Sequence, residues 1–178
     1  MSEATSSEIL KRLDALESES AIRQVVARYF RICDDLGPET PLDELGNLFT
    51  QDAKWDGKGR YAKAFGGYDG RDAIVAMIGS YCKAPPHFKM TAHFFSAEDI
   101  SVSGDNASGH WMMLQTSTYK DNSSDLRSAH LQLDFRREEG EWRISHFQST
   151  NIFSRKEDRW NDSDDIFVPD NSKDGARK

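Results

Sequence analysis

Cysteine is scarce in this sequence: its 178 residues contain 2, Cys33 and Cys82. The two fall on separate expected helices, and neither belongs to a pair with the short spacing of a metal site. We therefore expect two reduced, packed thiols, and nothing in the pattern supports a disulfide between them. This cysteine usage predicts a cytoplasmic protein.

Long apolar runs and an excess of positive charge are also missing. No run approaches the length of a membrane span, and the start, MSEATSSEILKRLD, lacks the apolar core of a signal peptide. The 23 Lys and Arg residues are outnumbered by 30 Asp and Glu residues, which gives a formal net charge of -7. That charge argues against nucleic acid or an anionic membrane surface as a partner.

Two groups of catalytic motifs are absent as well. The histidines fall on different expected elements with no H-x-x-x-H spacing, and there is no C-x-x-C, so no metal site is expected. No G-x-S-x-G follows an expected strand, which argues against a serine hydrolase of the common type.

The most regular stretch that the sequence does contain is AIRQVVARYFRICDDLG, residues 21–37. Its apolar residues recur at the spacing of one helix face: Ile22, Val25, Val26, Tyr29, Phe30 and Cys33. Asp34 comes four residues after Phe30, so the last turn carries a carboxylate where the stripe calls for an apolar residue. Ser18–Ser20 is expected to cap this helix and Gly37 to end it. Asp34 is then either a group for proton transfer or the start of a simple DDLG turn.

The rest of the chain predicts helices first and strands afterwards. Residues 7–18 predict a short amphipathic helix that packs against the body or a second subunit, and further helices begin at Pro41 and at about Arg71. Between them we expect a strand at about 53–56 and an exposed loop through Gly67. From Pro85 the period changes to two, and residues 89–104, 106–120, 125–140 and 141–153 predict four long strands. Their short turns imply an antiparallel meander. The expected fold class is α+β, in which three to four N-terminal helices and a curved antiparallel sheet enclose a pocket.

The order of these motifs resembles that of SnoaL-like proteins, members of the nuclear-transport-factor-2-like (NTF2-like) superfamily. The resemblance rests on AIRQVVARYFRICDD, LFTQDAKWD, YDGRDAIVAMI, the T-x-H of residues 91–93, NASGHWMM and EGEWRISHFQ. It covers about residues 21–153 and implies the cone-shaped α+β barrel of that superfamily.

Within the superfamily the motifs are most similar to those of scytalone dehydratase and the bile-acid 7α-dehydratase. The resemblance implies that His93 is the base, that Asp34 orients it, and that Tyr29 polarises a carbonyl or positions the leaving hydroxyl. Two positions depart from the pattern. The arginine of the bile-acid enzyme falls at about Asn151, and the second histidine of scytalone dehydratase matches His110 only with a one-residue gap.

Elimination of water β to a carbonyl needs a base for the C–H group, a donor to the enolate oxygen and an acid for the departing hydroxyl. An imidazole oriented by a carboxylate is a suitable base, and a phenol is a suitable donor. Such a pair in an apolar pocket requires neither a metal nor an organic cofactor. The alternative for His93 is a hydrogen-bonded core histidine.

His110 shares strand parity with Met112 and Leu114, so it either points into the cone as a second acid or has a structural role. His87 follows two prolines and is expected to face solvent. The apolar candidates for substrate binding could equally be plain core, and the polar ones could replace the missing arginine as neutral donors. These substrate-binding candidates are Trp55, Phe65, Met112, Phe147, Gln148 and Asn151.

The expected organisation is a disordered start at residues 1–6, a single domain at 7–154 and an acidic tail at 155–178. Trp160 and Phe167 in the tail could close over the pocket as a lid. The exposed sheet face typical of such a fold predicts a homodimer or homotrimer.

The expected function is a cofactor-independent dehydratase for a bulky, apolar hydroxy-ketone of steroid-like or polyketide-like type. Two alternatives stay open. The same residues could move a proton between carbons in an isomerase, or the chain could be a non-catalytic protein that binds a small hydrophobic molecule or assembles subunits.

Overall fold

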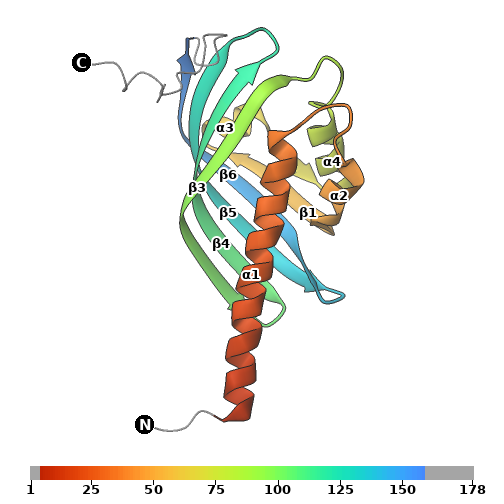
Figure 1. Ribbon diagram of the computed structural model, residues 1–178, viewed down its shortest axis with the longest axis vertical. Coiled ribbons are helices and arrows are strands. Elements are labelled where there is room, and N and C mark those ends of the chain that lie inside the picture. The colour runs from red at the N-terminus through yellow and green to blue at the C-terminus, as the bar shows by residue number, and fades with distance from the viewer. Residues whose placement is uncertain (1–4, 159–178) are drawn as a thin grey trace, which may run out of the picture.

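The computed structural model describes residues 5–158, in which four helices lie against one six-stranded sheet (Figure 1). The helices are α1 (Ser6–Asp34), α2 (Leu42–Asn47), α3 (Arg60–Ala64) and α4 (Arg71–Gly79). The strands are β1 (Phe49–Lys58), β2 (Gly67–Asp69), β3 (Phe88–Ser103), β4 (Asn106–Tyr119), β5 (Ser124–Glu138) and β6 (Glu141–Glu157). The long strands curve around α1, which confirms the predicted α+β class.

The order of strands in the sheet is β2-β1-β6-β5-β4-β3. Strands β3 to β6 form the predicted antiparallel meander, whereas β1 pairs with β6 in parallel and places Trp55 beside Phe147. The sheet stays open because its outer strands, β2 and β3, do not pair with each other. Helix α3 lies within the segment expected to be a loop, and strand β2 begins at its last residue, Gly67. Neither was predicted, because five and three residues are too short to produce a periodic pattern.

Helix α1 is continuous over 29 residues, which corrects the expectation of two helices separated by a cap at residues 18–20. The N-cap is Thr5, whose hydroxyl accepts a hydrogen bond from the backbone N–H of Glu8, and the Glu8 carboxylate accepts one from the Thr5 N–H. Ser18 is buried, and its hydroxyl accepts a hydrogen bond from Arg137 instead of capping the backbone. Because no glycine or proline interrupts residues 6–34, the helix runs through.

The predicted apolar stripe of α1 is confirmed. Its buried members pack against the sheet, chiefly on β3 and β6: Ile22, Val25, Val26, Tyr29 and Phe30. The first turns of α1 project beyond the sheet (Figure 1), and their apolar side chains, Ile9, Leu10, Leu13 and Leu16, are exposed. The expectation that these residues pack against the body of the domain is therefore wrong. Their packing against a second subunit stays a prediction.

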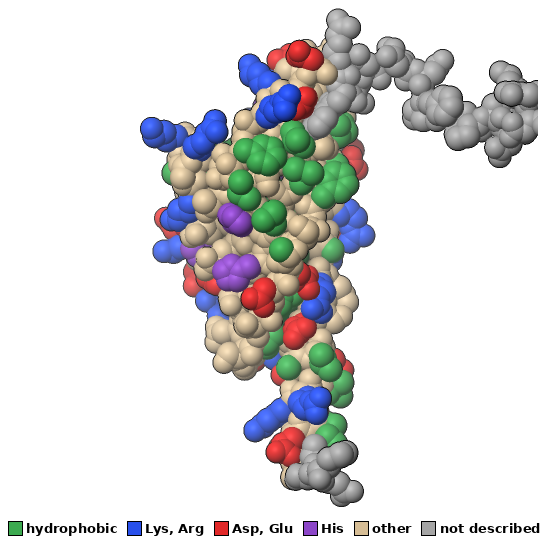
Figure 2. Space-filling model, turned by 90° about the vertical axis from the view of Figure 1, so that its left-hand side faces the viewer, with side chains coloured by type: hydrophobic (Ala, Val, Ile, Leu, Met, Phe, Trp, Pro, Cys, Tyr) green, Lys and Arg blue, Asp and Glu red, His purple; other side chains and the backbone are tan. Residues whose placement is uncertain are grey.

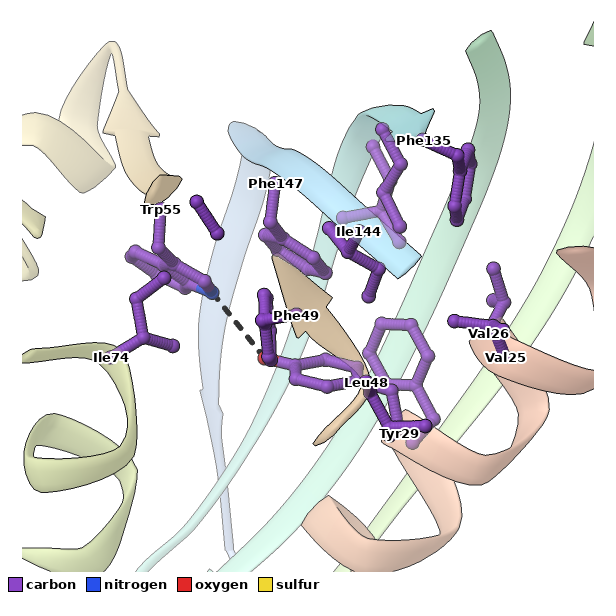
Figure 3. Close-up of a cluster of buried hydrophobic side chains, with 14 of the residues drawn as sticks. Val25, Val26, Tyr29, Leu48, Phe49, Trp55, Ile74, Phe135, Ile144 and Phe147 are labelled. Carbon is purple, nitrogen blue, oxygen red and sulfur yellow. Dashed lines mark hydrogen bonds between the residues drawn. The ribbon is translucent and has the colours of Figure 1, made fainter. Parts of the chain in front are cut away.

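A cluster of buried side chains fills the space between α1, the sheet and α4 (Figure 3). Phe49 and Ile144 have no exposed surface, and Phe135 has almost none. Trp55 and Phe147 belong to the cluster, and their rings stack with centroids 5.5 Å apart and planes at 3°. Both rings belong to the hydrophobic core and also line the cavity described below.

The first and last elements extend slightly beyond the expected domain boundaries. Thr5 and Ser6 already belong to the cap and first turn of α1, and β6 continues to Glu157, beyond residue 154. The proposed lid through Trp160 and Phe167 lies outside the described residues. Within residues 5–158 no helix is both long and apolar enough to span a membrane.

Candidate active site

A cavity of about 360 Å³ opens between α1, α3, α4 and the inner face of the sheet. Most of its wall is aromatic or aliphatic, a composition typical of sites for small organic molecules. The apolar and aromatic part of the wall consists of Tyr29, Phe30, Cys33, Leu36, Trp55, Tyr61, Phe65, Met77, Ile78, Tyr81, Phe88, Met113, Tyr119, Leu131 and Phe147.

His93 and Asp34 meet at one side of this cavity, although 59 positions separate them in the sequence. His93 lies on β3, and Asp34 is the last residue of α1. The Nδ1 atom of His93 is 2.5 Å from Oδ1 of Asp34, and the backbone N–H of His93 donates to Oδ2 at 3.4 Å. Both oxygens of one carboxylate thus hold one residue, which fixes the orientation of the ring.

The chemistry of this pair follows from its geometry. A carboxylate accepts hydrogen bonds but does not donate them, so in the neutral form of the ring the proton sits on Nδ1 and Nε2 keeps its lone pair. His93 lines the cavity and is otherwise packed against Phe30, with ring centroids 4.9 Å apart. Its side chain is 10% exposed, against 33% for Asp34. The imidazole is therefore largely shielded from solvent, whereas the carboxylate beside it remains partly exposed.

Tyr29 lines the same cavity and contacts Trp55 and Phe30. Its hydroxyl accepts a hydrogen bond of 3.3 Å from Nε1 of Trp55 (Figure 3), and its ring lies 4.8 Å from that of Phe30. Burial raises the pKa of Tyr29 well above its usual value, so the phenol keeps its proton and can donate it in a hydrogen bond. The structure thus brings Tyr29, His93 and Asp34 to one site, and their catalytic roles stay predictions.

Cys33 also lines the cavity, one turn after Tyr29 on α1. Burial raises the pKa of its thiol to about 12. At neutral pH the group is therefore a protonated, apolar part of the wall, and it is unsuited to act as a nucleophile.

Three predicted site residues lie on the wrong side of the sheet. His110 and Met112 share parity as expected, but the inward positions of β4 are Trp111, Met113 and Gln115. Side chains alternate between the two faces of a strand, so His110 and Met112 must face outward. They line a shallow outer depression together with Gln148, on a face where histidine and hydrophobic side chains are exposed together (Figure 2).

Asn151 is absent from the cavity wall and has a different task. An irregularity in the pairing of β5 with β6 places Ala129 opposite Asn151 but Ser128 opposite Phe153. The Nδ2 group of Asn151 donates to the carbonyl oxygens of Ser128 and Phe153, at 3.4 and 3.0 Å. Asn151 therefore braces a β-bulge by donating to carbonyl oxygens on both strands beside it. The expectation that it replaces an arginine as a substrate donor is corrected.

The structure places Trp55, Phe65 and Phe147 in the cavity wall, and their contact with a substrate stays a prediction. Phe65 packs edge-on against Trp55, with centroids 5.9 Å apart. His87, expected to face solvent, instead lines the cavity and packs edge-on against the ring of Tyr119. Burial is the main cause that lowers the pKa of His87.

Polar wall residues were missed by the sequence analysis, most notably Arg127 and Gln115. Gln115 could have been found, because a meander in register with His93 places an inward position of β4 opposite it. Arg127, inside DLRSAH, carries no local signal that separates it from a surface arginine. Within residues 5–158, no three His, Cys, Asp or Glu side chains gather closely enough to hold a metal ion.

Comparisons with known proteins agree with this architecture. A family model described as a SnoaL-like domain matches residues 14–148. No curated protein matches the sequence significantly. Among solved structures, hexachlorocyclohexane dehydrochlorinase LinA, type 2, is similar with a TM-score of 0.69 at 20% identity, over 89% of this chain and 98% of that one.

Two structures from Novosphingobium aromaticivorans are similar as well. A putative scytalone dehydratase has a TM-score of 0.66 at 19% identity, over 80% of this chain and 89% of that one. An NTF2-like protein with a cystatin-like fold has a TM-score of 0.64 at 21% identity, over 85% and 92% of the two chains. At these identities the likeness shows a shared fold.

Proposed function

This chain belongs to the SnoaL-like domain family, and from that premise we propose that it is a cofactor-independent lyase. The proposed reaction is the dehydration of a bulky, mostly apolar hydroxy-ketone of steroid-like or polyketide-like type. The observation that carries the proposal is the His93–Asp34 pair, in which Nδ1 is 2.5 Å from the carboxylate and the imidazole borders an apolar cavity.

The proposed mechanism begins with proton abstraction by Nε2 of His93. The base removes a hydrogen from the carbon α to the substrate carbonyl, and the negative charge moves to the carbonyl oxygen. Tyr29, which stays protonated, donates a hydrogen bond to that oxygen. Asp34 stabilises the imidazolium that forms, because its carboxylate faces Nδ1.

The second step returns the proton. The enolate electrons form a carbon–carbon double bond as the β-hydroxyl departs. The imidazolium of His93 gives its proton to the departing hydroxyl, which leaves as water. One hydroxy-ketone thus yields one enone and one water, with no oxidant or further reactant. Two of the similar structures are named for eliminations of this general kind, a dehydrochlorinase and a putative scytalone dehydratase, which supports a lyase over other activities of the fold.

The test uses 4-hydroxy-4-(2-naphthyl)butan-2-one, an aromatic β-hydroxy-ketone whose dehydration product absorbs strongly as a conjugated enone. We expect His93→Ala to lower kcat by about 10²–10⁴-fold, the usual contribution of a general base, while binding of the ketone persists. The matched control is His110→Ala, which removes a histidine from the outer face of the sheet and should leave kcat unchanged.

Other outcomes would assign the alternatives. A rearranged product of unchanged mass would make the protein an isomerase. Binding of hydroxy-ketones without conversion by the unmodified protein would favour a non-catalytic binding protein. Equal loss of activity in both histidine variants would refute the assignment of His93 as the base.

A further inference from the structure

A row of three polar side chains crosses the inner face of the sheet. His93 on β3 is paired with Gln115 on β4, and Gln115 is paired with Arg127 on β5. All three line the cavity. Paired residues on adjacent strands lie about 5 Å apart, so the Cα atoms of His93 and Arg127 are separated by about 10 Å. A ligand held against His93 therefore has a guanidinium within reach two strands away.

The guanidinium of Arg127 is held firmly in place from one side. Its Nε donates to Oδ2 of Asp125 at 2.6 Å, and its Nη2 donates to the hydroxyl of Tyr119 at 2.6 Å. That hydroxyl in turn donates to the same Asp125 oxygen at 2.9 Å. Within residues 5–158, Nη1 makes no hydrogen bond. A rigid donor group thus has N–H bonds left over at the wall of an otherwise apolar cavity.

The charge around Arg127 decides what it would bind. The carboxylate of Asp125 already neutralises the guanidinium, and the side chain of Asp125 is 11% exposed. Burial raises the pKa of Tyr119, which keeps that phenol uncharged. A carboxylate ligand would add an unbalanced negative charge in a poorly hydrated place, at a cost. A neutral oxygen adds none and still accepts a hydrogen bond from a charged donor.

We propose that Arg127 forms a subsite for an uncharged oxygen of the ligand, a ketone carbonyl or a hydroxyl, two strands away from His93. The subsite is separate from the carbonyl assigned to Tyr29, so the substrate carries a second oxygen function. The inference rests on the proposed function only in taking the cavity as the place where the substrate binds.

The test is calorimetric binding of three naphthalene probes of similar shape: 2-acetonaphthone, 2-naphthoate and 2-ethylnaphthalene. They present a ketone, a carboxylate and no oxygen. We expect the unmodified protein to bind the ketone at least roughly tenfold more tightly than the hydrocarbon, as for a hydrogen bond to a charged group, and the carboxylate more weakly than the ketone. Because Tyr29 can also donate to the single carbonyl, the Arg127 variants are compared in a Tyr29→Phe background. That background should keep a ketone preference, and adding Arg127→Met should bring the ketone to the affinity of the hydrocarbon, whose own affinity should not change.

Two further variants keep the result interpretable. Arg127→Met leaves Asp125 buried without its cation, so the double variant D125N/R127M removes both charges and should show the same loss of ketone preference. The matched control is Arg155→Met on β6, whose side chain is 75% exposed and absent from the cavity wall. It should bind all three probes as the unmodified protein does.

Three results would overturn the subsite: a ketone preference that survives in both Arg127 variants of the Tyr29→Phe background, tightest binding of the carboxylate, or no ketone preference in that background before Arg127 is changed. Failure of the proposed function is separable from these. If no hydroxy-ketone is converted but the ketone preference depends on Arg127, the lyase is wrong and the subsite stands.

Discussion

At the scale of single residues, His93 shows how one contact selects a chemical role. Its Nδ1 atom faces an acceptor-only carboxylate, so Nε2 is the atom left to take a proton. The paired backbone contact to the same carboxylate holds the strand and the helix end at a fixed separation. An imidazole that rotated freely about its side-chain bonds would lose this orientation, and with it the alignment that general-base catalysis requires.

Asn151 offers a residue-scale prediction, because the structure makes it a brace. Asn151→Ala removes the Nδ2 donor from the carbonyls of Ser128 and Phe153. We expect the free energy of unfolding to fall by about 0.5–1.5 kcal/mol, the usual net contribution of a hydrogen bond, because these contacts are exposed or only partly buried. The measurement is urea unfolding, and KM for the naphthyl hydroxy-ketone should not change.

The matched control for this prediction is Gln148→Ala, since Gln148 faces the outer depression and its side chain makes no hydrogen bond within the described residues. We expect it to unfold within about 0.5 kcal/mol of the unmodified protein, as surface substitutions usually do. A rise in KM for Asn151→Ala at unchanged stability would return Asn151 to the substrate site.

At the scale of elements, partly exposed charged residues support the parallel junction of β1 and β6. Nε2 of His146 on β6 is 2.8 Å from Oδ2 of Asp56 on β1, and Nδ1 is 3.6 Å from Asp134 on β5. The hydrogen bond to His146 is the main cause that lowers the pKa of Asp56 below its usual value. His146 on β6 thus contacts a carboxylate on each of its two neighbouring strands, β1 and β5.

This contact predicts a pH dependence of stability. Because the pKa of Asp56 is lower in the folded state, its contribution to stability is present above the unfolded value of about 3.9 and is lost as pH falls through the folded value. Asp56→Asn should therefore lower Tm at about pH 6, and its difference from the unmodified protein should shrink below about pH 4. Thermal unfolding across that range measures it.

Asp69→Asn is the control, because Asp69 lies on the neighbouring β2, is 87% exposed and pairs with Lys54 only at 4.0 Å. Its Tm should follow that of the unmodified protein at every pH. A difference for Asp56→Asn that stays constant or grows in acid would show that Asp56 is not stabilised by this hydrogen bond.

Elements with a long periodic pattern were predictable from the sequence, and those without one were not. The stripe of α1 and the four long strands gave the α+β class, and the family motifs gave Tyr29, Asp34 and His93. Parity on β4 was also right, but the period of two does not say which face is inward. Because of that ambiguity, His110 and Met112 were predicted on the wrong face of the sheet. Arg127 was missed because only the register across three strands brings it to the cavity.

At the scale of the whole molecule, two surfaces stand apart from the site. The outer face of the sheet exposes a group of apolar side chains, Phe94, Met112, Leu114, Ile152 and Phe153, on a molecule with a net charge of -7 (Figure 2). The projecting start of α1 exposes a second group. Exposed apolar patches of this kind often mark contact with another chain, so the homodimer or homotrimer stays a prediction.

The cavity itself is the feature on which the functional account depends. Helix α1 supplies the carboxylate and the phenol, β3 supplies the imidazole, and the meander carries the polar row to Arg127. Aromatic and aliphatic side chains form most of the remaining wall. The fold thus places an imidazole, its carboxylate partner and a phenol against an apolar wall.

The most direct measurement of the central claim is hydrogen exchange at carbon, since proton abstraction precedes any loss of water. In D₂O, NMR follows the loss of the methyl signal of 2-acetonaphthone, whose methyl hydrogens are α to a ketone. We predict that the unmodified protein and His110→Ala speed this exchange equally above buffer, and that His93→Ala and Asp34→Asn bring it to the buffer rate. Exchange in His93→Ala as fast as in the unmodified protein would contradict the account.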